Sequence, residues 1–211
     1  MIYQRPRREM VERLKHRGIH DKHVLAAMER VPRHLFVQPG MEFQAYDEKA
    51  LPIGFEQTIS HPYTVALMTQ VLQPEASGKI LEIGTGSGYQ AAVLLECGAR
   101  LFTVERIPPL ADRAKKKLEE LGYRFMLKTG DGTMGWPAYA PYDGIIITAG
   151  APVSPPTLLH QLKEGGRCVV PIGSEKGQML TLFIREKESL RKMEIEPLSF
   201  VPLIGKHGWQ K

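Results

Sequence analysis

Residues 80–90 read ILEIGTGSGYQ and decide the fold class of the chain. The short apolar stretch 80–83 is typical of a buried strand, and glycines follow it at positions 84, 86 and 88. Apolar residues then recur at helical spacing from 91 to 95. A strand, a glycine-rich turn and a helix in this order open a doubly wound parallel sheet, whose ligand lies beyond the carboxyl end of the strand. We therefore expect an α/β protein with a ligand beside Gly84, Gly86 and Gly88.

Strand-like and helix-like segments alternate after this motif, which favours a mostly parallel sheet with helices on both faces. The expected strands are residues 101–105, 125–128, 144–148 and 167–172, and the expected helices have their apolar residues within 110–121 and 158–162. The second of these helices should end at Gly165 and Gly166. Residues 179–185 and 190–198 should close the sheet as an antiparallel edge.

The chain before the motif is predicted to be a helical extension, residues 1–76, that precedes a core of residues 77–211. Met10, Val11 and Leu14 suit one face of a first helix, and Asp21 should cap a second helix that stops before Pro32. Residues 51–60 are rich in proline and glycine and predict a loop. A third helix should begin at Pro62, capped by Ser60 or His61, with an inner stripe at residues 65, 66, 68, 69 and 72.

The composition describes one globular domain, since 43% of the 211 residues are hydrophobic and 24% are charged. Lysine and arginine number 28 against 23 acidic residues, and the resulting charge of +5 suits either solubility or nucleic acid. Cys97 and Cys168 lack metal-ligand spacing, so we expect a reduced, cytoplasmic compartment and no metal. The apolar stretches are too short to span a bilayer, so we expect no membrane. The chain contains no asparagine, which excludes N-glycosylation and catalytic motifs that need this residue.

Three carboxylates at expected strand ends indicate which cofactor the glycine turn binds. A dinucleotide fingerprint would place glycine at position 89, which is Tyr89, so nicotinamide binding is disfavoured. Glu82, two residues before the first glycine, suits a cofactor with cationic groups, such as the sulfonium and amino groups of S-adenosylmethionine. Glu105 stands where a carboxylate accepts hydrogen bonds from ribose hydroxyls, and Asp131 would lie at the adenine side of the crevice.

Each of these features also has a structural explanation. The glycines could serve only the geometry of a tight turn. Glu82 could cap a helix, Glu105 could pair with Arg106 on the surface, and Asp131 could form a turn with its flanking glycines. The occurrence of all three carboxylates at successive strand ends favours the cofactor site.

Several motifs resemble, in the same order, the protein-L-isoaspartate O-methyltransferases. They are LEIGTGSGYQ at 81–90, VER at 104–106, GDG at 130–132 and FVPL at 200–203, preceded by LPIG at 51–54 and QTISHPY at 57–63. The resemblance covers nearly the whole chain, and its most specific part is the segment 51–63, which in this family closes over cofactor and substrate. It implies a Rossmann-like, S-adenosylmethionine-dependent methyltransferase fold. The cofactor-binding residues would be Glu82, Gly84, Thr85, Gly86, Gly88, Glu105, Asp131 and Gly132, and the substrate-binding residues Thr58, Ile59, Ser60 and His61.

Two positions depart from the commoner bacterial pattern of this family, in which glycine precedes the glutamine and glutamine follows the serine. The chain has Glu56 and His61 there. Because an inward carboxylate would repel an anionic substrate, we expect Glu56 to face solvent or to pair with a base. We interpret His61 as a helix cap or packing residue.

The resemblance implies an L-isoaspartyl substrate in damaged proteins and peptides, whose free α-carboxylate is the nucleophile. With a pKa of about 3.5 this group is ionised at neutral pH and needs no general base. Ser60 matches the active-site serine of the family, and the helix N-terminus behind it suits an anion. We expect Ser60 to orient the carboxylate; its alternative role is an ordinary helix cap. The methyl ester formed would close to a succinimide, and hydrolysis would return some aspartate.

Three other functions fit parts of the sequence. A nucleic-acid methyltransferase would need an Asn/Asp-Pro-Pro-Tyr/Phe element where residues 148–152 read TAGAP, or a Pro-Cys nucleophile, and the chain has neither. The lysines at 115–117 are explained as the solvated face of a helix. A binding module without turnover and a nicotinamide oxidoreductase also remain as alternatives. We expect a monomer that acts on isoaspartyl proteins without nucleic acid.

Overall fold

The computed structural model describes residues 2–187 and 189–210. Its N-terminal part contains α1 (Gln4–His16), α2 (Lys22–Arg30), η1 (Arg33–Leu35), η2 (Glu42–Gln44), β1 (Leu51–Gly54), β2 (Gln57–Ile59) and α3 (Pro62–Leu72). The core continues with β3 (Lys79–Ile83), α4 (Tyr89–Glu96), β4 (Arg100–Glu105), α5 (Pro108–Glu120), β5 (Met126–Thr129), η3 (Gly132–Met134), η4 (Pro137–Tyr139), β6 (Tyr142–Ile147), α6 (Pro156–Leu159), β7 (Leu162–Ser174), β8 (Gly177–Arg185) and β9 (Leu190–Leu198).

Seven strands form one sheet in the order β5-β4-β3-β6-β7-β8-β9. The pairs from β5 to β7 are parallel, and β8 and β9 add antiparallel strands at one edge. This arrangement confirms the predicted doubly wound sheet and its antiparallel edge. Because the chain returns from β5 to lay β6 beside β3, the strand order reverses between these two strands, and ligands bind at such a reversal.

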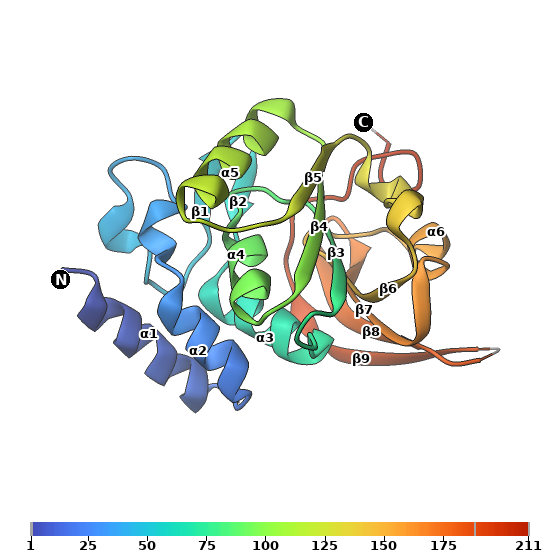
Figure 1. Cartoon of the computed structure of the whole chain (residues 1–211), viewed down its shortest axis with the longest axis horizontal. Helices are drawn as coiled ribbons and strands as arrows, with labels where there is room; N and C mark the ends of the chain where they lie inside the picture. Colours follow the sequence, from blue (N-terminus) through green and yellow to red (C-terminus); the bar gives the residue numbers. More distant parts are fainter. Residues whose placement is uncertain (1, 188, 211) are drawn as a thin grey trace.

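Apolar layers cover both faces of the sheet. Alternate strand residues such as Ile80 and Ile146 pack with α1 to α5, whereas Leu81 and Ile145 pack with α6 and the C-terminal residue Leu203. Figure 1 shows the N-terminal helices against α3 and α4, on the opposite side of the sheet from α6. No helix within 2–187 and 189–210 is long and apolar enough to cross a membrane.

The first two helices confirm the sequence prediction. Met10, Val11 and Leu14 are the buried residues of α1. Asp21 caps α2, since its carboxylate accepts hydrogen bonds from the backbone N–H groups of His23 and Val24. Caps of this kind satisfy donors that the first helical turn leaves unpaired.

The predicted loop at residues 51–60 is wrong, because these residues form an antiparallel hairpin of β1 and β2. Leu51, Ile53 and Ile59 are buried, which is what fixes the register. The turn has left-handed φ angles at both Phe55 (54°) and Glu56 (57°). Such turns usually contain Asn-Gly or Asp-Gly, so the sequence lacked the usual hairpin signal.

The predicted helix end at Gly165 and Gly166 is also wrong. The helix α6 stops at Leu159, and β7 begins at Leu162, which pairs with Tyr142 of β6. The ladder is irregular just after this pair, and a Cβ at Gly166 would lie 2.8 Å from the carbonyl oxygen of Lys163. The two glycines therefore allow a bulge inside a strand, and do not end a helix.

Candidate functional site

A cleft opens at the carboxyl ends of β3 and β6, where the strand order reverses. It contains about 890 Å³ of unfilled space, open solvent included. The cleft is lined by the hairpin, α3, the glycine turn and the start of α4, the ends of β3, β4 and β6, η3 and the C-terminal segment. The lining residues are 57–60, 65, 68, 83–87, 89, 90, 104–107, 132, 148, 149 and 201–204.

Backbone of the glycine turn forms one wall of the cleft. The Thr148 hydroxyl donates to the carbonyl oxygens of Gly84 (2.7 Å) and Ile83 (3.0 Å), so the end of β6 holds the turn in place. A Cβ at Gly84 would overlap this hydroxyl, and its φ of 94° also favours glycine. Gly86 lines the cleft as well, but Gly88 does not, since it faces Leu118 of α5.

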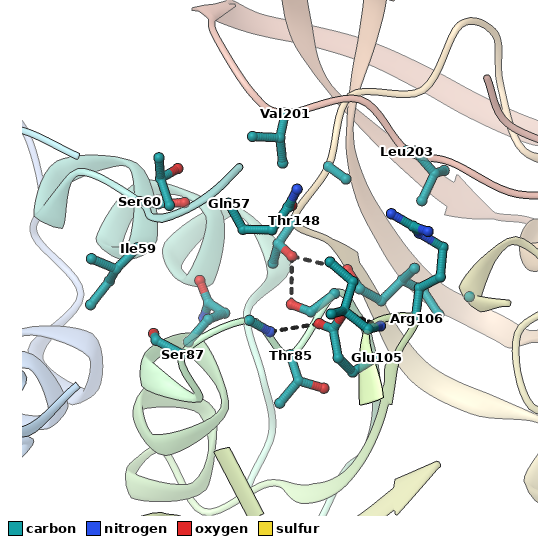
Figure 2. A pocket seen from close by; sticks show the side chains of 18 of the residues that line it. Gln57, Ile59, Ser60, Thr85, Ser87, Glu105, Arg106, Thr148, Val201 and Leu203 are labelled. Carbon is teal, nitrogen blue, oxygen red and sulfur yellow. Dashed lines mark hydrogen bonds between the residues drawn. The ribbon is translucent and has the colours of Figure 1, made fainter. Parts of the chain in front are cut away.

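Glu105 lies where the sequence predicted a carboxylate. It is 6% exposed and lines the cleft. One carboxylate oxygen accepts from the N–H of Gly86 (2.8 Å) and the other from that of Ile107 (2.9 Å), as Figure 2 shows in part. Each oxygen keeps a further lone pair for a ligand hydroxyl. Among the described residues Glu105 forms no ion pair with Arg106, which was its structural alternative.

Glu82 lies behind the glycine turn and does not line the cleft. Its side chain is fully buried, and one oxygen accepts from the Thr103 hydroxyl at 2.6 Å, which in turn bonds the Thr85 hydroxyl at 2.6 Å. Only Thr85, the last member of this chain, reaches the cleft. Burial raises the pKa of Glu82 to about 8, so the group is largely protonated at neutral pH. It therefore presents no full negative charge to a ligand.

Asp131 points at the C-terminal strap, which we define as residues 199–210, and not into the cleft. Its carboxylate accepts from the N–H (2.8 Å) and hydroxyl (2.6 Å) of Thr133 and from the N–H of Lys206 (2.8 Å). The neighbouring Gly132 does line the cleft. A Cβ there would lie 2.5 Å from Cγ2 of Ile83, so glycine keeps this wall open.

The predicted substrate segment forms the opposite side of the cleft. Thr58, Ile59 and Ser60 line it, but His61 does not. His61 caps α3 instead, with Nδ1 accepting from the N–H of Tyr63 at 3.0 Å, which confirms its predicted role as a helix cap. Figure 2 shows Ser60 on the side of α3, with Val201 and Leu203 of the strap beyond it.

Ser60 is consequently not the helix cap that was its alternative role. Its hydroxyl forms no hydrogen bond with any residue in 2–187 or 189–210, while its carbonyl oxygen accepts from Nη2 of Arg33 at 2.8 Å. Glu56, at the turn of the hairpin, is exposed as expected and does not line the cleft.

Sequence reasoning missed several contributors to the site, among them Thr148, Arg33 and the strap residue Ile204. Thr148 is the last residue of a predicted strand, so the strand-end argument that found Glu105 could have found it too. No local signal marks Arg33, because its partners are 12 and 27 residues away in the sequence.

Comparisons with known proteins agree on one family. The family model described as Protein-L-isoaspartate(D-aspartate) O-methyltransferase (PCMT) matches residues 5–208. Protein-L-isoaspartate O-methyltransferase of Chlorobium phaeobacteroides is 53% identical over 204 residues, which cover 96% of this chain and 94% of the relative. The corresponding enzyme 1 of Syntrophobacter fumaroxidans is 52% identical over 210 residues, covering 99% and 98%.

Solved structures agree with this result. A protein-L-isoaspartate O-methyltransferase matches with a TM-score of 0.86 at 30% identity, covering 96% of this chain and 67% of that one. A Plasmodium falciparum protein whose structure holds S-adenosyl-L-homocysteine has a TM-score of 0.82 at 22% identity, covering 94% and 98%, which is a likeness of fold.

Proposed function

Because the chain belongs to the protein-L-isoaspartate(D-aspartate) O-methyltransferase family, we propose that its cleft holds S-adenosylmethionine and that Ser60 orients the carboxylate to be methylated. The chain is accordingly a repair enzyme that methylates the free α-carboxylate of L-isoaspartyl residues. The assignment of Ser60 rests on one observation: its hydroxyl lines the cleft without a hydrogen bond to any described residue.

The residues around the cleft fit the cofactor. Glu105 has lone pairs left to accept hydrogen bonds from the two ribose hydroxyls, while Gly86 and Ile107 keep its carboxylate in position. Gly84, Thr85, Gly86 and Gly132 allow the cofactor to approach the backbone closely. When bound, S-adenosylmethionine supplies an electrophilic methyl group on a sulfonium.

The chemistry requires orientation and not proton abstraction. The substrate α-carboxylate is already ionised at neutral pH, so one of its oxygens can attack the methyl carbon while the bond to sulfur breaks. Placing two reactants in line contributes about 7 to 11 kcal/mol to such a step. The Ser60 hydroxyl can donate one hydrogen bond to the other carboxylate oxygen and fix its direction.

The N-terminus of α3 offers fewer free donors for this anion than the sequence suggested. Pro62 has no N–H, and the N–H of Tyr63 is bonded to His61. The Ser60 hydroxyl therefore takes a larger share of the orienting role in this proposal.

The experiment that tests the proposal uses labelled cofactor and a matched pair of peptides, one isoaspartyl and one aspartyl. We expect base-labile methyl incorporation into the isoaspartyl peptide only, since the aspartyl peptide has no free α-carboxylate at that position. Ser60→Ala should lower kcat by roughly 10²-fold and leave cofactor affinity within about twofold. Ser154→Ala, which removes an exposed hydroxyl away from the cleft, is the control. An unchanged kcat in Ser60→Ala would sink the orienting role.

The remaining expectations stay proposals. The lysines of α5 are offset by acidic residues one turn away, Lys115 by Glu119 and Lys117 by Glu120, which supports a solvated face and not a nucleic-acid groove. We also propose a monomer, a cytoplasmic location, and the division into residues 1–76 over the cleft and residues 77–211 as the core. The return to aspartate through a succinimide follows from the chemistry of the ester.

A further inference from the structure

Arg33 is a fully buried side chain directly behind the substrate side of the cleft. It lies in η1, and its exposed fraction is 0%. Its Nε donates to the carbonyl oxygen of Ala45 (2.6 Å) and its Nη2 to that of Ser60 (2.8 Å). Its Cζ lies 4.6 Å from the ring centroid of Tyr89, which also lines the cleft. Arg33 thus contacts two of the residues that form the cleft wall.

This guanidinium has no negative partner within residues 2–187 and 189–210. Its contacts there are neutral: two carbonyl oxygens and a tyrosine ring. The remaining nitrogen, Nη1, is buried and makes no hydrogen bond. Burying an unpaired charge costs several kcal/mol, and arginine does not lose its proton to escape that cost. A buried cation beside a cleft is therefore available to stabilise an anion that enters the cleft.

The neighbouring His61 adds no second positive charge at this position. His61 lies next to Ser60, and burial together with the charges of Arg17 and Arg33 lowers its pKa despite the opposing effect of Glu48. The His61 imidazole is therefore uncharged at neutral pH and does not itself attract the anion.

We propose that Arg33 is a positioning residue that supplies the positive charge for the substrate α-carboxylate, acting through the Ser60 peptide group to which it donates. The proposal rests on the proposed role of Ser60. The hydrogen bond to the Ser60 carbonyl holds the main chain of Ser60 in place at the cleft, and the buried charge favours a carboxylate over a neutral group there. Because protein surrounds the charge, its effect on the cleft is screened less than that of a surface cation.

The test separates charge from shape by comparing an isoaspartyl peptide with its α-methyl ester, each titrated calorimetrically into the enzyme saturated with S-adenosylhomocysteine. Wild type should bind the acid more tightly than the ester. Arg33→Gln retains an amide donor but loses the charge, and should weaken binding of the acid about tenfold, or about 1.4 kcal/mol. Binding of the ester and of S-adenosylhomocysteine should stay within about twofold. Arg33→Lys restores the charge and should recover most of the affinity for the acid.

Arg185 provides a matched control, because it too donates to two carbonyl oxygens, those of His160 and Leu162, but does not line the cleft. Arg185→Gln should leave both peptide affinities unchanged. Equal weakening of acid and ester in Arg33→Gln would show a structural role only and overturn the proposal, as would unchanged binding of both. If the wild-type enzyme binds the acid and the ester with equal affinity, the proposed carboxylate site at Ser60 is refuted instead.

One measurement on wild type keeps the proposal testable if Arg33→Gln does not fold. Because Arg33 is buried, the preference for the acid should change less than about threefold between roughly 0.05 and 0.5 M salt. If the preference for the acid disappears over this range of salt, it comes from surface charge, and the role of Arg33 is refuted.

Discussion

Asp131→Ala should lower the stability of the protein and its affinity for the substrate. Its affinity for the cofactor should change less. The sequence suggested that Asp131 lies at the adenine, yet its carboxylate holds the C-terminal strap through Thr133 and Lys206. A Cβ at Gly205 would overlap the Asp131 carboxylate, so the strap packs closely against Asp131. The strap residues 201–204 line the cleft.

The expected loss follows from three hydrogen bonds. Asp131 is the N-cap of η3, and losing a cap costs about 1 kcal/mol. The bond to the exposed N–H of Lys206 adds about 1 kcal/mol, and the buried Thr133 hydroxyl, left without its acceptor, adds up to about 1 more. The sum of about 2 to 3 kcal/mol corresponds to a fall in Tm of roughly 4 to 12 °C for a chain of this size.

Thermal unfolding, peptide kinetics and cofactor titration together check this prediction. We expect the KM for an isoaspartyl peptide to rise about fivefold or more, with the Kd for S-adenosylhomocysteine within about threefold. Asp47→Ala removes an exposed carboxylate paired with Lys49, and it should change neither the KM for the peptide nor the Kd for S-adenosylhomocysteine. A tenfold loss of cofactor affinity with unchanged Tm and KM would refute the anchoring argument and support an adenine contact.

The pH dependence gives an independent check on the same residue. Burial alone would raise the pKa of Asp131, but hydrogen bonds from Thr133 and Lys206 outweigh it and hold the pKa below the ordinary 3.8. The stability that the carboxylate contributes is therefore present above about pH 4 and lost as the pH falls through its folded-state pKa. The difference in unfolding free energy between wild type and Asp131→Ala should be full at neutral pH and shrink in acid.

Two further predictions concern the cleft wall and the buried acid. Gly132→Ala should lower Tm and weaken S-adenosylhomocysteine binding at least about fivefold, because the added Cβ would meet Ile83. Gly177→Ala is the control, because the space around Gly177 is open, and it should be neutral or slightly stabilising. Thermal unfolding measures the stability and calorimetry the binding. Burial raises the pKa of Glu82 from 4.5 to about 8, so its contribution to stability is complete below about pH 4.5 and lost as the pH rises through about 8. Glu82→Gln should therefore lose less unfolding free energy than wild type between about pH 6 and pH 9 in urea titrations, and an equal loss would contradict this.

Much of the fold was predictable because it depends on local patterns. The strand, glycine turn and helix at residues 79–96 follow from hydrophobic spacing, and the cap at Asp21 from its side chain. The hairpin at 51–59 was not predictable in this way, because Phe55 and Glu56 adopt left-handed φ angles that side chains of their type seldom favour. Packing of Leu51, Ile53 and Ile59 in the core outweighs that cost.

The candidate site was predictable to the level of strand ends and no further. The ends of parallel strands bring Glu82, Glu105 and Asp131 to one region of the sheet. Their place in the sequence does not predict which neighbouring groups donate hydrogen bonds to their carboxylates. Asp131 is held by Lys206, which is 75 residues away in the sequence, and Glu82 by Thr103 on the adjacent strand. Arg33 likewise depends on contacts that only the folded chain creates.

These contacts explain how a cleft near three acidic residues can accept an anionic nucleophile. Three ionised carboxylates facing the cleft would repel the substrate. Glu82 is largely protonated, Asp131 is turned to the strap, and the charge of Glu105 is partly offset by two backbone N–H groups. Arg33 adds a buried positive charge on the substrate side. We expect this arrangement to favour binding of the ionised carboxylate, which needs no general base because it has already lost its proton.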